Sequence, residues 1–110
     1  MMTEVKVIDF TRYPGPRFKK LGKGSGEEFR ESYLYPKFSN DHELVVNLDG
    51  AKGYGSSFLE EAFGGLIRKY NLTKNDVKFL MDHIISKNDP TLADEVREYM
   101  QDALNVRTRK

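Results

Sequence analysis

The stretch ELVVNLDGAKGYGSSFLEEAFGGLIRKY, residues 43–70, decides the fold. Residues 44–48 form an apolar run that contains two adjacent valines and is too short for a helix. The turn dipeptide Asp49-Gly50 ends this run. We therefore expect a buried strand that leads into a loop, where glycines 50, 53 and 55 place few steric restrictions on the backbone.

An amphipathic helix is expected after this loop. Ser57 and Glu60 have the spacing of a capping box, which makes Ser57 the expected N-cap. Apolar residues then recur at helical spacing. The charged residues are expected to face solvent, namely Glu60, Glu61, Arg68 and Lys69. The expected buried face consists of Phe58, Leu59, Ala62, Phe63, Leu66, Ile67 and Tyr70. Strand, loop and helix in this order are one unit of an α/β domain.

Two adjacent glycines, Gly64 and Gly65, lie inside the expected helix. Each costs about 1 kcal/mol relative to alanine in a helix interior, so a compensating contact is expected. We expect the helix to approach the sheet closely at this point. A hinge or a groove for a partner is the alternative.

Alternating strands and helices are predicted on both sides of this unit. Residues 82–86 are ambiguous between helix and strand, and the β-branched pair Ile84-Ile85 favours a strand. Capping boxes are also predicted for Ser25 with Glu28, Thr73 with Asp76 and Thr91 with Asp94. The remaining expected elements are a strand within residues 5–10, a loop at 11–26 with room for a short strand at 17–20, a helix from 26 to 35 that Pro36 stops, a short helix at 73–80 and a helix at 92–104.

The length of 110 residues suits one compact domain. We expect a single α/β domain over residues 1–110, in which helices pack on a small mixed sheet of about four strands and the central strand is paired on both sides. Residues 1–4 and 106–110 are expected to fray.

Composition excludes several classes of function. With 18 basic and 17 acidic side chains the net charge is +1, which argues against general attraction to nucleic acid. There is no cysteine, and His42 and His83 are the two histidines, so we expect no metal site and no cofactor. No apolar run is long enough to cross a bilayer, and residues 1–10 lack the pattern of a signal peptide. We expect a cytoplasmic protein that does not contact membranes.

No set of catalytic residues is apparent from spacing. Glu60 and Glu61 are adjacent, as are Glu27 and Glu28, but neighbouring helix positions point about 100° apart, so neither pair is expected to share a proton or a metal. Two histidines give few chances for a pair of nucleophile and base. We expect a protein that is not an enzyme.

The segment LVVNLDGAKGYGSSFLEEAFGGL resembles the core of the STAS-like domains, small bacterial proteins mostly of unassigned function. That family also tends to carry Gly-x-Arg and Ser-Gly-Glu-Glu-Phe-Arg further upstream. Here these motifs read Gly15-Pro16-Arg17 and Ser25 to Arg30. The resemblance covers roughly residues 7–103 and implies a STAS-like fold.

These domains are related in pattern to the STAS domains of anti-sigma factor antagonists, in which a serine at the start of a helix is phosphorylated. Ser56 falls on that serine and Ser57 on the next one, whereas Gly55 and Phe58 replace the flanking Asp and Gly. The resemblance implies a regulatory interaction module whose partner is a histidine-kinase-like ATPase or an anti-sigma factor. The implied interface is the Gly53–Phe58 loop with the exposed face of the following helix, and its residues are Tyr54, Gly55, Ser56, Ser57, Phe58 and Glu61, with Ser56 as the phosphorylation site. Capping of the helix by Ser57 is the purely structural alternative.

Residues 22–26 support a second hypothesis, a binding site for a nucleotide or another phosphate ligand. They form a glycine loop before a helix, where free N–H groups attract anions, although no Walker A motif is present. Arg12, Lys19 and Lys20 add to a segment without acidic residues. The candidate anion-binding residues are Arg17, Lys23, Gly24 and Ser25. A third hypothesis is a small inhibitor from a mobile element that uses this fold to block a host complex.

Overall fold

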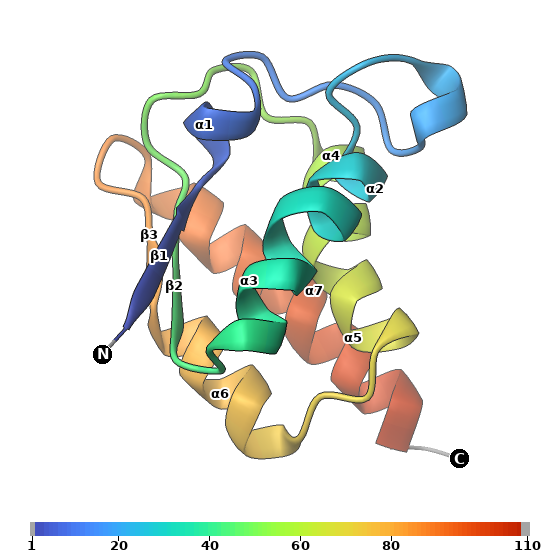
Figure 1. Cartoon of the computed structure of the whole chain (residues 1–110), viewed down its shortest axis with the longest axis vertical. Helices are drawn as coiled ribbons and strands as arrows, with labels where there is room; N and C mark the ends of the chain where they lie inside the picture. The colour runs from blue at the N-terminus through green and yellow to red at the C-terminus, as the bar shows by residue number, and fades with distance from the viewer. Residues whose placement is uncertain (1, 109–110) are drawn as a thin grey trace.

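The structure is a computed structural model that describes residues 2–108 (Figure 1). In the described chain, strands β1 (Thr3–Lys6), β2 (Leu44–Asn47) and β3 (Ile84–Ile85) form one sheet in the order β1-β2-β3. All pairings are parallel, with Val5 opposite Val46 and Val46 opposite Ile84. The central position of β2 and the strand at Ile84–Ile85 confirm the predictions from the sequence. The expected mixed sheet of about four strands is wrong, because three parallel strands form it.

The first strand is shorter than expected because the chain turns into α1 (Val7–Phe10). This helical turn places Phe10 against Phe29 and Tyr33, with ring centroids 5.7 and 5.1 Å apart. The expected strand at residues 17–20 is also absent, and a 3-10 turn, η1 (Lys19–Leu21), lies there. Backbone groups of this region pair with the start of the next helix, since Glu27 N donates to Arg17 O at 3.0 Å.

The first long helical segment consists of α2 (Gly26–Phe29), the π-helical turn η2 (Arg30–Leu34) and α3 (Tyr35–Asn40). The expected stop at Pro36 is wrong. Pro36 lies in the first turn of α3, directly after the π-helical turn. A π-helical turn already departs from the regular i→i−4 bonding, so the N–H that proline lacks does not end the helix.

The second segment consists of α4 (Ser56–Leu59), the π-helical turn η3 (Glu60–Gly64) and α5 (Gly65–Lys69). It is followed by α6 (Lys74–Asp82) and α7 (Pro90–Thr108). The turn η3 packs against α7 as well as α2 and η2, so this segment lies among the other helices (Figure 1). From Phe58 to Ile67 every residue except Glu60 is buried. Glu61, expected on the solvent side, is therefore inside.

Two of the four predicted caps are correct. Thr73 and Asp76 form the capping box of α6, and Ser25 Oγ accepts from Glu28 N at 3.0 Å. Ser57 is not a cap, because α4 begins at Ser56, two residues earlier than predicted, and Gly55 is its N-cap without a side-chain bond. Thr91 is not a cap either. Its N–H donates to the carboxylate of Asp89 at 3.2 Å, and Pro90 opens α7, a position that suits proline.

The ends of the chain take part in regular structure. Thr3 and Glu4, expected to fray, pair in β1, and residues 106–108 continue α7. Met1 and residues 109–110 lie outside the described residues. The core between sheet and helices contains Phe29, Phe58 and Phe63, each at most 1% exposed. No helix of the described chain is both long and apolar enough to cross a membrane.

Candidate functional site

The serine loop, residues 53–57, lies beyond the carboxyl end of β2, where the chain enters α4 (Figure 1). Gly53, Gly55, Ser56 and Ser57 are all exposed. Gly53 has a φ of +74°, a conformation that favours glycine. The loop therefore presents backbone and two hydroxyl groups to solvent, with no side chain larger than serine from residue 55 to residue 57.

Tyr54, within this loop, points inward. Its hydroxyl donates to Leu48 O at 2.8 Å, and its ring packs edge-on against Phe58 at 6.0 Å. Burial, and to a lesser degree the charge of Asp49, raises the pKa of the Tyr54 hydroxyl. Tyr54 is half-buried and ties the loop to the residue that follows β2, so it supports the loop and is not a free interface side chain.

The structure separates the candidate interface residues into two groups. Phe58 is fully buried in the aromatic cluster around Phe29, and Glu61 is 9% exposed. A partner that docks on this structure cannot reach these two side chains. Gly55, Ser56 and Ser57 remain as the exposed candidates, and α7 lies beside them.

Ser56 has a neighbour on α7. The hydroxyl of Tyr99 donates to Glu95 Oε2 at 2.6 Å, and this bond, together with burial, raises the pKa of Tyr99 to about 12. The Ser56 side chain interacts with the same hydroxyl, and this interaction lowers the pKa of Tyr99. Ser56 therefore lies close to a tyrosine that is already bonded to a carboxylate.

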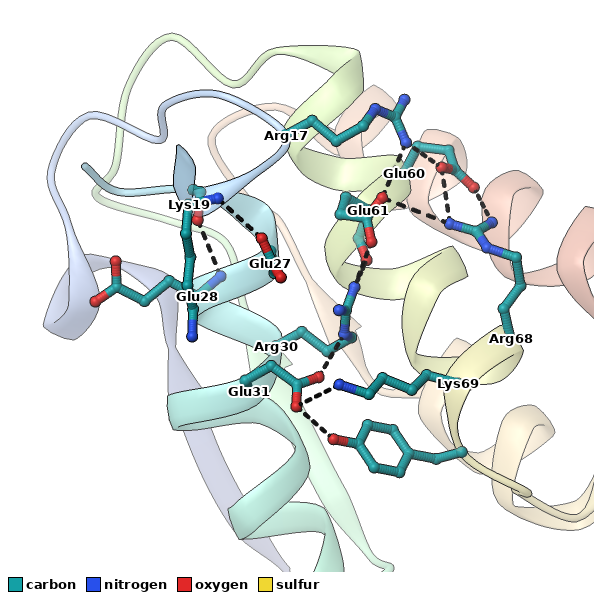
Figure 2. Close-up of polar contacts among 12 residues, drawn as sticks. Arg17, Lys19, Glu27, Glu28, Arg30, Glu31, Glu60, Glu61, Arg68 and Lys69 are labelled. Atoms are coloured by element: carbon teal, nitrogen blue, oxygen red, sulfur yellow. Dashed lines mark hydrogen bonds and ion pairs between the residues drawn. The ribbon is translucent and has the colours of Figure 1, made fainter. Parts of the chain in front are cut away.

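Behind the serine loop, Glu60 and Glu61 are held by arginines (Figure 2). Arg17 Nη1 donates to Glu60 Oε1 at 2.6 Å and to Glu61 Oε1 at 3.2 Å. Arg68 Nη2 donates to Glu60 Oε1 at 3.1 Å. Burial opposes ionisation of Glu60, but the hydrogen bonds from Arg68 and Arg17 outweigh it and lower the pKa of this carboxyl. The adjacent glutamates thus share a cation, the guanidinium group of Arg17.

A buried ion pair joins the two long helical segments. Arg30 Nη1, on η2, donates to Glu61 Oε2 at 2.6 Å and to Glu61 O at 2.8 Å (Figure 2). A Cβ on Gly65 would collide with Arg30 Nη1 and lie 3.1 Å from Glu61 Oε2. The expected contact of the glycines with the sheet is wrong. Gly65 instead leaves room for the guanidinium group of another helix.

Glu31 extends this network. It accepts hydrogen bonds from Tyr70 Oη at 2.6 Å, Arg30 Nε at 2.8 Å and Lys69 Nζ at 3.0 Å. Burial alone would raise its pKa, but the bonds from Tyr70, Arg30 and Lys69 prevail and hold it at about 2. The motif residues Arg17, Arg30 and Glu61 are therefore joined in one network that ties the N-terminal loop and two helical segments together.

The candidate anion-binding residues do not form an open phosphate loop. Ser25 is fully buried and caps α2, and Arg17 is bound to the two glutamates. Gly26 N and Glu27 N donate to Pro16 O and Arg17 O. Gly24 O accepts from Gly15 N at 2.8 Å, which leaves Lys23 as the exposed cation of this set. The helix N–H groups that an anion needs are already bonded.

Sequence reasoning missed a pocket of about 380 Å³ at the carboxyl ends of β2 and β3. Its walls are the loop after β2, including Asp49 and Tyr54, and the loop after β3, including Asn88. The Asp49 carboxylate accepts from Lys87 N at 3.1 Å and Asn88 N at 3.0 Å and so connects the two loops. The sequence feature that could have predicted this pocket is the Asp49-Gly50 turn directly after an apolar strand, because ligands bind at the carboxyl ends of parallel strands.

The histidines of the described chain serve local structure. His83 Nδ1 lies 2.7 Å from Phe79 O, and His42 Nδ1 lies 3.2 Å from Asp76 Oδ1. Within residues 2–108, no three metal-binding side chains of the His, Cys, Asp or Glu type gather at one point.

One family model matches the chain, that of the STAS-like domain of unknown function (DUF4325), over residues 25–89. The matched region is more than half of the chain and runs from the cap of α2 to the loop after β3, and it includes the serine loop and the network residues Arg30 and Glu61 but not Arg17. Curated proteins and solved structures give no match. The chain therefore belongs to the family of STAS-like domains of unknown function.

Proposed function

We propose that this protein is a non-enzymatic regulatory module that binds a protein partner through the exposed residues of the serine loop. By resemblance, the partner is a histidine-kinase-like ATPase or an anti-sigma factor. The module would act by occupying the partner, and phosphorylation of Ser56 would release it.

One observation carries this proposal. The second helical segment is buried from Phe58 to Ile67 apart from Glu60, whereas Gly55, Ser56 and Ser57 at its start are exposed. The start of this segment is therefore open to a partner, whereas the exposed Arg68 and Lys69 at its other end are bonded to Glu60 and Glu31. Small side chains there allow the backbone of a partner to approach closely, and the hydrogen bond from Tyr54 to Leu48 O holds the loop in a defined position.

The surroundings of Ser56 support control by charge. A phosphate there would add nearly two negative charges beside Tyr99, whose hydroxyl is bonded to the carboxylate of Glu95. Like charges at short distance repel, so the modified serine would move away from α7 or disturb the Tyr99–Glu95 bond. Either change alters the surface that the partner meets.

The test compares partner capture by three forms of the protein in extract of the native host, read by mass spectrometry. The wild type is expected to retain one ATPase or regulator, and Ser56→Asp to lose most of it, because a charge in an interface without a counter-charge is costly. Ser39→Asp is the matched control. Ser39 is also exposed, but it lies on α3 before β2 begins, at the opposite end of that strand.

The captured protein is then purified and its dissociation constant is measured with all three forms. An increase of about tenfold or more for Ser56→Asp alone supports the proposal. Equal affinity of all forms, with equal melting temperatures, excludes the serine loop as the switch. Equal loss for Ser56→Asp and Ser39→Asp indicates an effect of net charge and contradicts the proposed surface.

A further inference from the structure

A second pocket, which we call the basic pocket, lies at the carboxyl ends of β1 and β2. It has a volume of about 300 Å³ and is lined by Ile8, Arg12, Tyr13, Gly50 and Lys52. The chain leaves β1 through α1 toward Arg12 and leaves β2 toward Gly50, and because these strands are parallel neighbours, both segments meet at one edge of the sheet. In parallel α/β sheets this edge is where ligands bind.

The basic pocket is held together from both sides. Lys52 N donates to Arg12 O at 2.8 Å, which joins the two segments. Gly50 has a φ of +98°, and a Cβ there would lie 3.3 Å from Cβ and Cγ1 of Ile8. Gly50 therefore packs closely against Ile8, and the two residues together line one side of the basic pocket. A volume of about 300 Å³ is at the lower end of the range of small-molecule sites.

Uncompensated positive charge is the second feature of the basic pocket. Arg17, Arg30, Arg68 and Arg97 each form an ion pair with a carboxylate. Within residues 2–108, the side chains of Arg12 and Lys52 form no such pair, both are exposed, and no carboxylate is among the residues that line the basic pocket. Asp49, next to Gly50, is occupied by the N–H groups of Lys87 and Asn88.

The third feature is an open aromatic ring. Tyr13 is 72% exposed, although tyrosine side chains are usually of intermediate burial. An exposed ring beside two free cations suits a ligand that has both a planar group and a negative charge. A phosphate takes several charge-assisted hydrogen bonds from arginine and lysine, and a planar base stacks on tyrosine.

We propose that the basic pocket binds a phosphorylated small molecule with a planar ring, in which Arg12 and Lys52 hold the phosphate and Tyr13 stacks on the ring. Nucleotides belong to this class. The site differs from the glycine loop at residues 22–26, whose helix N–H groups are bonded within the protein. The residues that line it include neither Gly55, Ser56 nor Ser57, so loss of ligand binding here would leave the proposed serine-loop interaction untouched.

Amide NMR titrations with ADP, pyrophosphate and adenosine test this proposal at a fixed ionic strength of about 0.1 M, at which exposed charges are screened beyond about 10 Å. ADP is expected to cause saturable shifts centred on the amides of Gly50 and Lys52. The variant Arg12→Gln/Lys52→Gln should bind ADP and pyrophosphate at least about tenfold more weakly. Tyr13→Ser should weaken ADP binding about fivefold or more and leave pyrophosphate binding unchanged.

Lys20→Gln is the matched control, because Lys20 is an exposed lysine on η1 that does not line the basic pocket. It should bind all three probes as the wild type does. All the replaced side chains are exposed, so the variants should keep the melting temperature of the wild type. If ADP does not saturate the protein at about 10 mM, its dissociation constant lies above the millimolar range and the proposal is overturned. Equal ADP binding by the double variant, or equal binding of ADP and adenosine, also overturns it.

Discussion

At the scale of single residues, charged side chains inside this protein are held by specific partners. Arg30 is 5% and Glu61 9% exposed, and each would be costly to bury alone. Their mutual bond and the second bond from Arg30 to the Glu61 carbonyl satisfy both groups. Gly65 is part of the same arrangement, because any side chain at that position would displace the guanidinium group.

Glu31 predicts a pH dependence of stability. Its pKa is lowered from 4.5 to about 2 in the folded protein, so its bonds stabilise the fold fully above pH 4.5, and this contribution is lost as the pH falls toward 2. Glu31→Gln should reduce the free energy of unfolding by about 1–2 kcal/mol at pH 7. The difference from the wild type should shrink between pH 4.5 and 2, measured by urea unfolding.

Glu43→Gln is the control for this experiment, because Glu43 is exposed and its side chain forms no ion pair within residues 2–108. It should follow the wild type at every pH. A Glu31→Gln difference that stays constant from pH 7 to pH 3 would show that the carboxylate of Glu31 is not stabilised by its partners.

At the scale of elements, the two long helical segments each contain a π-helical turn, η2 and η3. Arg30 begins the first of these turns and Glu61 lies in the second, so the buried ion pair joins one π-helical turn to the other. Such turns interrupt regular helical bonding and are frequent at functional sites. Here they accompany the contact between the segments.

Replacing the serine near the start of each segment should affect stability differently. Ser25 is buried and caps α2, whereas Ser57 is exposed and lies inside the first turn of α4 without capping it. Ser25→Ala should lower the free energy of unfolding by about 1 kcal/mol or more. Ser57→Ala should change it by less than about 0.5 kcal/mol, as is usual for surface substitutions. Equal losses in urea unfolding would contradict the observed helix start at Ser56.

At the scale of the whole molecule, Arg17 joins the N-terminal loop, residues 11–26, to the second helical segment. Its bonds to Glu60 and Glu61 span 43 and 44 residues of sequence. The same loop follows β1 and contributes Arg12 and Tyr13 to the basic pocket. One loop therefore connects the arginine network with the edge of the sheet.

Arg17→Ala should loosen this loop without unfolding the protein. Arg17 is partly exposed, so we expect a loss of about 1 kcal/mol or less in global stability. Hydrogen exchange of the Gly26 and Glu27 amides, which donate to the loop, should accelerate about fivefold as the loop opens locally. Arg12→Ala, which removes an exposed arginine of the same loop, should leave these rates unchanged. Unchanged exchange in both variants would mean that the backbone bonds alone hold the loop.

Local chemistry in the sequence predicted several elements correctly. The strand at residues 44–48, the strand at Ile84–Ile85, the cap at Ser25 and the capping box at Thr73 each depend on residues that are close in sequence. The family could be recognised for the same reason, since each of its motifs is a short continuous stretch, one of them around the serine loop. Gly55, Ser56 and Ser57 do lie at an exposed helix start, but the helix begins at Ser56, so the predicted cap at Ser57 is wrong.

The tertiary structure alone decided which of these residues are available. Glu61 has the pattern of a solvent-facing residue, but a second helix covers it and supplies Arg30 from 31 positions away. The parallel order of the strands and the meeting of Arg12 with Lys52 also depend on contacts between distant segments. Sequence determines such features only through the packing of the whole chain, because burial and charge pairing are properties of neighbours in space.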